Sequence, residues 1–160
     1  MNSAYLLSGT NLGDRLENIK TAAQLISEHC GTITTHSSVY ETAAWGKTDQ
    51  PSFLNQALKL STTLNAKQLI RRLLKIEQQM GRIRHEKYGP RKIDIDILFF
   101  NDEIYNLPFL KIPHPELQNR RFVLVPLSEI VPAFIHPILK KTVIELLKDC
   151  PDELMVKKYS

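Results

Sequence analysis

The stretch GPRKIDIDILFF, from Gly89 to Phe100, carries the clearest strand pattern in the chain. Three isoleucines alternate with Asp94 and Asp96, so we expect the isoleucines on one face of a sheet and both carboxylates on the other. Aspartate is disfavoured in strands, and two like charges about 6 to 7 Å apart on one face repel each other. The stretch therefore predicts a strand with a compensating positive charge beside its two aspartates.

Strand and helix patterns alternate before this stretch. AYLLSG near the N-terminus predicts a strand, GTNLGD a turn, and apolar residues then recur at helical spacing up to Gly31. Thr32 to Glu41 and FLNQALKLST, residues 53–62, predict two strands that pair through the loop between them. Asn65 offers an N-cap for a long helix that closes at Gly81.

The elements after the stretch are shorter. They are a strand or turn near Glu103 to Tyr105, an apolar helix near Leu124 to Ile130, and a final helix from Thr142 to Asp149. Strands separated by two substantial helices, with one hairpin, predict an α+β sandwich with a mostly antiparallel sheet. With 160 residues, 42% hydrophobic and 24% charged, the chain fits one domain, residues 1–160, with its own core.

Composition and charge narrow the class of protein. The N-terminus lacks the regions of a secretory signal, and no segment is apolar for the roughly 18 residues of a membrane span, so we expect a cytoplasmic protein with no membrane partner. Cys30 and Cys150 lack the spacing of a zinc site or a disulfide framework. A net charge of +4 favours an anionic partner, either nucleic acid or a phosphorylated small molecule.

Basic residues lie close to the two aspartates in the sequence. On one interpretation, Lys92 shares the strand face with Asp94 and Asp96 and neutralises them on a solvated surface. On another, the carboxylates bind Mg²⁺, which is usually held by one or two carboxylates and substrate phosphates, while arginines contact those phosphates. The basic residues available on either side are Arg82, Arg84, Lys87, Arg91, Lys92, Arg120 and Arg121.

The common nucleotide motifs are absent from the chain. It has no GxxxxGK[ST], and SGTNLG does not match the GxGxxG dinucleotide fingerprint. Two other classes of protein stay open on these residues alone. An RNA-binding module would suit a basic α+β domain, although the chain has neither an RNP-like GFGFV run nor a GXXG loop. A metal-dependent nuclease would use the same acidic pair with Mg²⁺.

Five blocks of sequence, in the same order, resemble one known family. They are GTNLGD, DQPSFLNQAL, IEQQMGRIR, GPRKIDIDILFF and IPHPELQNRRFVLVPL, and the fourth is similar to the family signature GPRxxDxDxLxF. Over nearly its whole length the chain resembles the 6-hydroxymethyl-7,8-dihydropterin pyrophosphokinases of folate biosynthesis.

This resemblance implies both a fold and an activity. The fold is a ferredoxin-like α/β sandwich with a mostly antiparallel sheet and helices packed on it. The activity is ATP- and Mg²⁺-dependent transfer of the terminal pyrophosphoryl unit of ATP to the hydroxymethyl oxygen of the pterin, giving the pterin diphosphate and AMP. The expected partners are therefore ATP and 6-hydroxymethyl-7,8-dihydropterin, with no nucleic acid, and we expect a monomer.

The resemblance also implies roles on the phosphate side of the site. Asp94 and Asp96 are the implied ligands of two Mg²⁺ ions that bridge the ATP phosphates. Without the family, Glu77 would be an exposed helix charge, and His114, between two prolines, a loop-packing residue. The cations implied on the phosphates are Arg82 and Arg91. Further implied ATP contacts are Ile70, Lys75, Glu77, Arg84, Lys87, Tyr88, Ile97, Leu110, Lys111, His114 and Arg120.

On the pterin side, the resemblance implies an aromatic slot with a polar edge. Phe53 and Phe122 are the implied rings on either side of the pterin, and Asn55 shares a strand face with Phe53. By themselves the two rings would be core aromatics and Asn55 an exposed strand residue. The loop whose backbone contacts pterin in this family carries, in this chain, Thr42, Ala43 and Trp45.

Three positions depart from residues common in the family. Ala43 stands where many members have proline, which predicts a less stiff loop. Pro115 stands where some members have an aromatic residue, and Tyr88 where some have tryptophan. None of the three is an implied metal ligand, so the implied activity is unchanged.

Overall fold

The computed structural model describes residues 1–43, 51–81 and 92–159. Its helices are α1 (Arg15–His29), α2 (Ala66–Gln79), α3 (Arg121–Ile130), α4 (Val143–Asp149) and the short 3-10 helix η1 (Leu117–Asn119). Its strands are β1 (Asn2–Thr10), β2 (Thr32–His36), β3 (Tyr40–Thr42), β4 (Phe53–Thr62), β5 (Asp94–Phe100), β6 (Tyr105–Leu107), β7 (Leu110–Ile112) and β8 (Val156–Lys158).

One antiparallel sheet organises the molecule. Its strands run in the order β5-β1-β4-β3-β8, and β2 also pairs with β4. Every pairing within it is antiparallel, and β6 and β7 form a separate small hairpin. With β2 and β3 counted as one interrupted strand, since both pair with β4, the order along the chain is β-α-β-β-α-β. This order, with β5 and β4 on either side of β1, is the ferredoxin-like arrangement. The predicted α+β sandwich with a mostly antiparallel sheet is confirmed.

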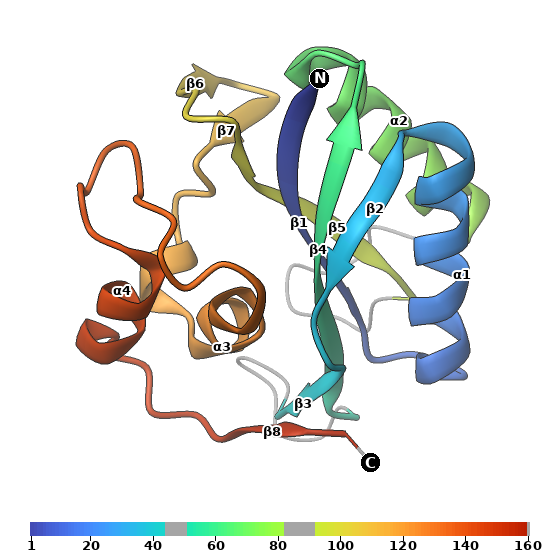
Figure 1. Cartoon of the computed structure of the whole chain (residues 1–160). Helices are drawn as coiled ribbons and strands as arrows, with labels where there is room; N and C mark the ends of the chain where they lie inside the picture. The colour runs from blue at the N-terminus through green and yellow to red at the C-terminus, as the bar shows by residue number, and fades with distance from the viewer. Residues whose placement is uncertain (44–50, 82–91, 160) are drawn as a thin grey trace.

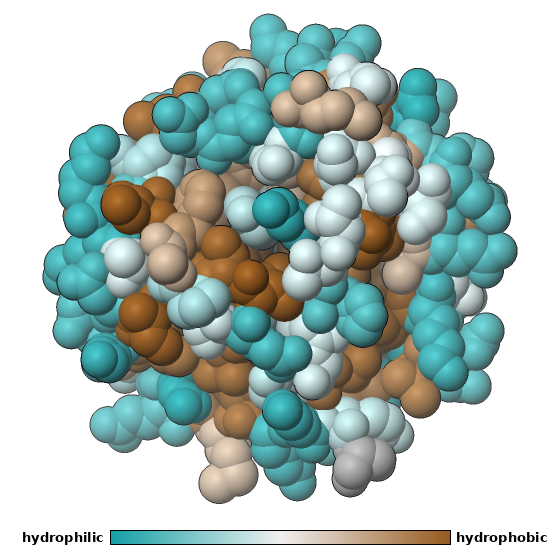
Figure 2. All heavy atoms as spheres, viewed as in Figure 1, coloured by the Kyte–Doolittle hydropathy of each residue, from teal (hydrophilic) through white to brown (hydrophobic). Residues whose placement is uncertain are grey.

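Helices cover both faces of this sheet. In Figure 1, α1 and α2 lie on one face and α3 and α4 on the other. The α1/α2 face buries Leu6, Leu58, Leu73 and Ile97 in one apolar cluster. A second cluster, on the α3/α4 face, includes Tyr5, Leu7, Phe99, Leu124 and Leu127. Figure 2 shows apolar side chains at the surface where α3 and α4 lie, with polar side chains around them.

The α2 helix follows its predicted pattern closely. Asn65 caps it through a reciprocal pair of hydrogen bonds, in which Asn65 Oδ1 accepts from Gln68 N and Gln68 Oε1 accepts from Asn65 N, each at 2.9 Å. This capping box satisfies two backbone donors that would otherwise have no partner. Among the described residues, no helix combines the length and apolar character needed to cross a membrane.

The expected strand from Thr32 to Glu41 is wrong as a single element, because the chain bulges in its middle. Ser37 N donates to Ala57 O at 2.9 Å, and Ser37 Oγ accepts from Ala57 N at 2.9 Å, so the serine side chain replaces a backbone acceptor. Between His36, opposite Leu58, and Tyr40, opposite Asn55, three residues face two on β4. Such a bulge bends a strand and ends its regular pairing.

Smaller differences lie in the second half of the chain. The strand expected near Glu103 to Tyr105 is β6, which begins at Tyr105 and pairs with β7. The apolar helix expected near Leu124 begins earlier, at Arg121. The C-terminal strand β8 is absent from the predicted elements, because three residues that gain their hydrogen bonds only from β3 carry little pattern of their own.

Candidate active site

The two aspartates lie on the α3/α4 face, as their alternation with isoleucine predicts. Across β1, Asp94 is opposite Gly9 and Asp96 is opposite Leu7, a residue of the α3/α4 cluster. Asp94 is half-buried and Asp96 is exposed. The isoleucines between and beside them belong to the cluster on the other face. Two carboxylates therefore reach one surface of the sheet from an element whose other side is anchored in the core.

Glu77 holds the strand that carries the aspartates. Its Oε2 accepts a hydrogen bond of 2.7 Å from Ile95 N, between Asp94 and Asp96 in the sequence. Because β5 is an edge of the sheet, a carboxylate from α2 supplies an acceptor where no strand of the described residues does. Glu77 is only 5% exposed, so the interpretation of Glu77 as an exposed helix charge is wrong. Its spacing of four from buried Leu73 is the sequence signal for this burial.

Asn55, Gly9 and Asp94 form a row across three neighbouring strands. Gly9 of β1 pairs with Asn55 of β4 on one side and with Asp94 of β5 on the other. A Cβ built on Gly9 would lie 2.3 Å from Asn55 Nδ2, so the amide of Asn55 extends over the glycine. Gly9 is not among the predicted site residues. The signal that marks it is a glycine inside a strand, where a close approach is common.

Two buried oxygens of this region lack a hydrogen-bond partner among the described residues. Asn55 Nδ2 donates to Ser8 O at 3.3 Å, but Asn55 Oδ1 has no donor. Thr42 Oγ1, on β3, has none either. Both residues are under 5% exposed, which makes the interpretation of Asn55 as an exposed strand residue wrong. A buried acceptor without a donor costs about 1–3 kcal/mol, so these oxygens are suited to a polar ligand.

The two aromatic residues lie on the same face as this row. Phe53 pairs with Thr42 and stands two residues before Asn55, so its side chain shares the face of Asn55. Phe122 is in the first turn of α3 and packs against the α3/α4 cluster. The guanidinium carbon of Arg120 lies 5.9 Å from the centroid of the Phe122 ring. Both aromatic side chains are half-buried, which leaves ring surface for a ligand.

His114 is fixed beside β5 as a neutral imidazole. Its backbone N donates to Leu98 O at 3.1 Å, and its Nδ1 accepts from Glu116 N at 3.2 Å. Burial, aided by the positive charge of Arg120, lowers the pKa of His114 to about 4. Since Nδ1 is an acceptor, the proton of the neutral ring is on Nε2, which can donate to a ligand.

The other predicted nucleotide contacts fall into two groups. Ile97 and Leu110 are buried in the α1/α2 cluster, with Ile70 packed against it, so Ile97 and Leu110 leave little side-chain surface for a ligand. Lys75 and Lys111 are exposed. The three apolar side chains thus gather on the opposite face from the aspartates, with the edge strand β5 between the two sides.

Several predicted site residues lie outside the described part of the chain. Ala43 is the last described residue before the first gap, and it is exposed. Within the described ranges, no group of three or more His, Cys, Asp or Glu side chains is placed to hold a metal. The site residues that are not described are Trp45, Arg82, Arg84, Lys87, Tyr88 and Arg91.

Comparisons with known proteins point to one family. Residues 5–132 match the family model described as 7,8-dihydro-6-hydroxymethylpterin-pyrophosphokinase. A relative from Aquifex aeolicus, named 2-amino-4-hydroxy-6-hydroxymethyldihydropteridine pyrophosphokinase, is 44% identical over 141 residues, which are 88% of each chain. A folic acid synthesis protein of Dictyostelium discoideum is 40% identical over 94% of this chain, which spans only 23% of that longer protein.

A solved structure supports the fold. The Plasmodium falciparum HPPK-DHPS triple mutant superposes with a TM-score of 0.74 at 21% identity. The match covers 92% of this chain and 44% of the Plasmodium chain, so this chain spans less than half of that protein. At this identity the likeness is one of fold, and it agrees with the ferredoxin-like arrangement described above.

The contact between Gly9 and Asn55 predicts a specific coupling between the two positions. Gly9→Ala places a methyl group against the Asn55 amide, so we expect the free energy of unfolding to fall by about 1–3 kcal/mol. In an Asn55→Ala background the amide that clashes with the new methyl group is absent. Gly9→Ala should therefore lower the free energy of unfolding much less in that background. Denaturant unfolding of the four proteins in this double-mutant cycle measures the coupling. An equal cost in both backgrounds contradicts the contact.

The lowered pKa of His114 predicts a pH dependence of stability. Because the unfolded histidine takes up a proton near its ordinary pKa of 6.5 and the folded one only near 4, the stabilisation is complete above pH 6.5 and is lost as the pH falls toward 4. His114→Asn should therefore flatten the stability curve between pH 7 and pH 5. The pKa of His136 is also lowered by burial, and His136 is present in both proteins, so the difference between them isolates His114. An NMR titration of His114 with a midpoint near 6.5 would refute this.

Proposed function

The chain belongs to the 7,8-dihydro-6-hydroxymethylpterin pyrophosphokinase family and transfers pyrophosphate to hydroxymethyldihydropterin in folate biosynthesis, and we propose that ATP is the donor and that the α3/α4 face binds both substrates. The observation that carries this proposal is the row of Asn55, Gly9 and Asp94. In this row, Asn55 on β4 is suited to recognise the pterin, and Asp94 on β5 is suited to the magnesium and phosphates of ATP. Only the bare backbone of Gly9 lies between them.

Distances within a sheet support this division. Neighbouring strands are about 4.8 Å apart, so the strands on either side of β1 are separated by roughly twice that distance. A bicyclic ring with a one-carbon arm can bridge this gap. A pterin held at Asn55 therefore directs its hydroxymethyl group toward Asp94 and Asp96, where the phosphates of ATP would be.

Two buried oxygens on the pterin side of the site can accept hydrogen bonds from the polar edge of the pterin ring. The amino group and ring N–H of a pterin are donors, and Asn55 Oδ1 and Thr42 Oγ1 are buried oxygens without a donor among the described residues. Phe53 and Phe122 supply aromatic surface on the same face of the sheet. We assign the pterin contacts to these four side chains. Ala43 and the undescribed Trp45 remain predictions from the family.

The acidic pair fits magnesium by the chemistry of its donors. Mg²⁺ prefers oxygen ligands, keeps several waters and is commonly held by one or two carboxylates with substrate phosphates, which agrees with two carboxylates and no third ligand among the described residues. We assign Asp94 and Asp96 to two Mg²⁺ ions bound with ATP. When bound, the metal supplies positive charge that offsets the charge of the phosphate oxygens.

The remaining groups position ATP. Glu77 fixes the backbone of β5 and so the direction of both carboxylates, and Nε2–H of neutral His114 is available to a phosphate or a base. Because β5 is an edge strand, a nucleotide with phosphates at the aspartates can pass this edge toward Ile70. Arg82 and Arg91, which are not described, remain our assignment as the cations on the phosphates.

Bond changes in the proposed reaction are few. The hydroxymethyl oxygen of the pterin bonds to the β-phosphorus of ATP, the bond from that phosphorus to the oxygen retained by AMP breaks, and the hydroxyl proton is released. Positioning and charge neutralisation supply most of the catalysis in such transfers. The direct test is AMP formation from ATP, Mg²⁺ and 6-hydroxymethyl-7,8-dihydropterin. A protein that forms no AMP beyond a reaction without pterin does not have this function.

The acidic pair can be tested with substitutions of equal size. Asp94→Asn or Asp96→Asn removes a charge at the metal, so we expect AMP formation to fall by about 100-fold or more while pterin affinity changes little. Asp102→Asn, at an exposed aspartate just beyond β5, is the matched control and should keep full activity. Turnover within threefold of the wild-type protein in either site variant would reject the metal assignment.

The aromatic slot makes a second prediction. Phe53→Ala or Phe122→Ala should weaken pterin binding by about 1–3 kcal/mol, the contribution of an aromatic stack, and leave the affinity for an ATP analogue nearly unchanged. Calorimetry with each ligand measures the two affinities separately. Phe109→Ala serves as a control, because Phe109 is 55% exposed in the turn between β6 and β7. A loss confined to the ATP analogue would disprove the slot.

A further inference from the structure

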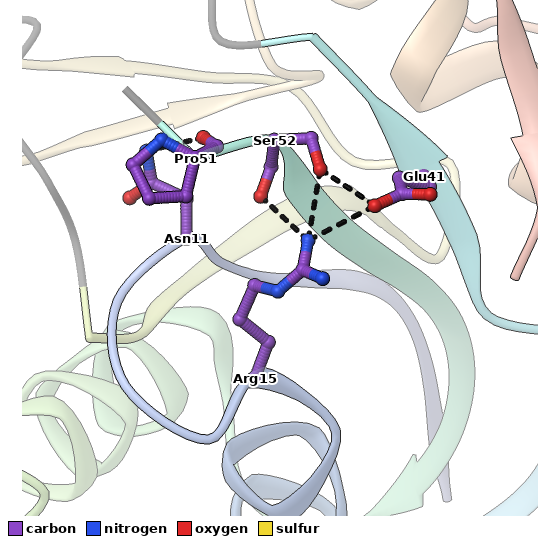
Figure 3. A network of polar contacts seen from close by, with 5 residues as sticks. All are labelled: Asn11, Arg15, Glu41, Pro51 and Ser52. Carbon is purple, nitrogen blue, oxygen red and sulfur yellow. Dashed lines mark hydrogen bonds and ion pairs between the residues drawn. The ribbon is translucent and has the colours of Figure 1, made fainter. Parts of the chain in front are cut away.

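Arg15 joins the ends of two strands that carry pterin-side residues. Its Nη1 donates to Glu41 Oε2 at 3.1 Å, to Ser52 O at 3.0 Å and to Ser52 Oγ at 2.8 Å (Figure 3). Ser52 Oγ in turn donates to Glu41 Oε2 at 2.6 Å. Asn11 Nδ2 donates to Pro51 O at 3.2 Å and ties the same segment to the turn before α1. We call Arg15, Glu41 and Ser52 the arginine clamp.

The clamp lies directly behind the proposed pterin slot. Glu41 immediately precedes Thr42 in β3, and Ser52 immediately precedes Phe53 at the start of β4. Side chains alternate along strands, so those of Glu41 and Ser52 point away from the face that Thr42 and Phe53 share. Arg15 therefore has no place in the slot itself. It fixes the backbone on which two slot residues stand.

A second layer covers the clamp from the C-terminus. Strand β8 pairs with β3 and sets Lys157 opposite Glu41. Tyr159 N donates to Val39 O at 2.9 Å, and the Arg15 guanidinium carbon lies 5.7 Å from the centroid of the Tyr159 ring. Arg15 and Glu41 each have side chains that are 23% exposed, so their ion pair is better shielded from water than a surface pair.

The carboxylate at the centre of the clamp stays ionised under ordinary conditions. Hydrogen bonds from Ser52 and Arg15, with the nearby charge of Lys157, lower the pKa of Glu41. The charge-assisted contacts thus persist across the neutral range. By contrast, the phosphate-side strand β5, which is an edge of the sheet, is held by Glu77 of another helix, α2.

We propose that Arg15 is a positioning residue for the pterin side of the site, acting through Glu41 and Ser52 on Thr42 and Phe53. This inference rests on the proposed function. Because the two sides of the site are held by different helices, loss of the clamp should loosen pterin binding and leave the phosphate side intact. A merely structural role would instead lower stability without separating the two substrates.

The test compares two arginines substituted in the same way. Arg15→Gln should raise the KM for pterin about tenfold, with kcat at saturating pterin and the Kd for an ATP analogue each within about twofold. Arg72→Gln is the matched control, because Arg72 donates to the backbone oxygen of His29 at the far end of α1. Arg72→Gln should change neither the KM for pterin nor the KM for ATP. Arg15→Lys keeps the charge and should recover part of the lost pterin affinity.

The effect of the clamp can also be measured without any ligand, by amide hydrogen exchange. Amide hydrogen exchange at Thr42 and Phe53 should be faster in Arg15→Gln than in the wild-type protein, and unchanged at Ile95, whose N–H is bonded to Glu77. If Arg15→Gln does not fold, Ser52→Ala removes the hydroxyl contacts alone and should give a smaller change in the same direction.

The outcomes separate this inference from the function on which it rests. A wild-type protein that forms no pterin-dependent AMP rejects the function itself. An active wild-type protein whose Arg15→Gln variant keeps its KM for pterin rejects only the positioning role. The same holds if kcat falls with KM unchanged, or if Arg72→Gln raises the KM for pterin as much as Arg15→Gln does.

Discussion

The pairing of β1 with both β4 and β5 is the constraint on which the site depends. Its register places Gly9 between Asn55 and Asp94, and a shift by one residue would turn the aspartates into the α1/α2 core. The apolar residues of β1 hold that register, because Leu6 is packed on one face and Leu7 on the other. The core therefore determines which polar groups meet at the surface.

Glu77 shows how a polar group can serve the fold and the site together. A buried carboxylate is costly unless it is hydrogen-bonded, and Glu77 accepts from Ile95 N at 2.7 Å. The same bond supplies an acceptor to a buried backbone donor at the edge of the sheet and orients the segment between the two aspartates. The acidic residue on the buried side of α2 is thus explained by β5, since its bond to Ile95 joins residues 18 apart in the chain.

The sequence predicts strand alternation and helix caps well, because these depend on residues close together in the chain. It does not predict strand breaks or short strands whose hydrogen-bond partners lie far away in the chain. The alternation in residues 93–97 and the cap at Asn65 are local and were identified correctly. The break at Ser37 requires Ala57 as a partner, and β8 requires β3. The burial of Asn55 depends on the absence of a side chain at Gly9, which no propensity scale records.

The two halves of the site are anchored independently, and this matters for how substrates are bound. Arg15 of α1 holds the ends of β3 and β4, whereas Glu77 of α2 holds β5. Strand β1 lies between β4 and β5 and pairs with both. On the proposed assignment of the substrates, a small displacement of one anchor changes the contacts of one substrate and leaves those of the other in place. The relative placement of the hydroxymethyl group and the phosphates is then set by the rigid core around β1, where Leu6 and Leu7 are fully packed, and catalysis by positioning requires this rigidity.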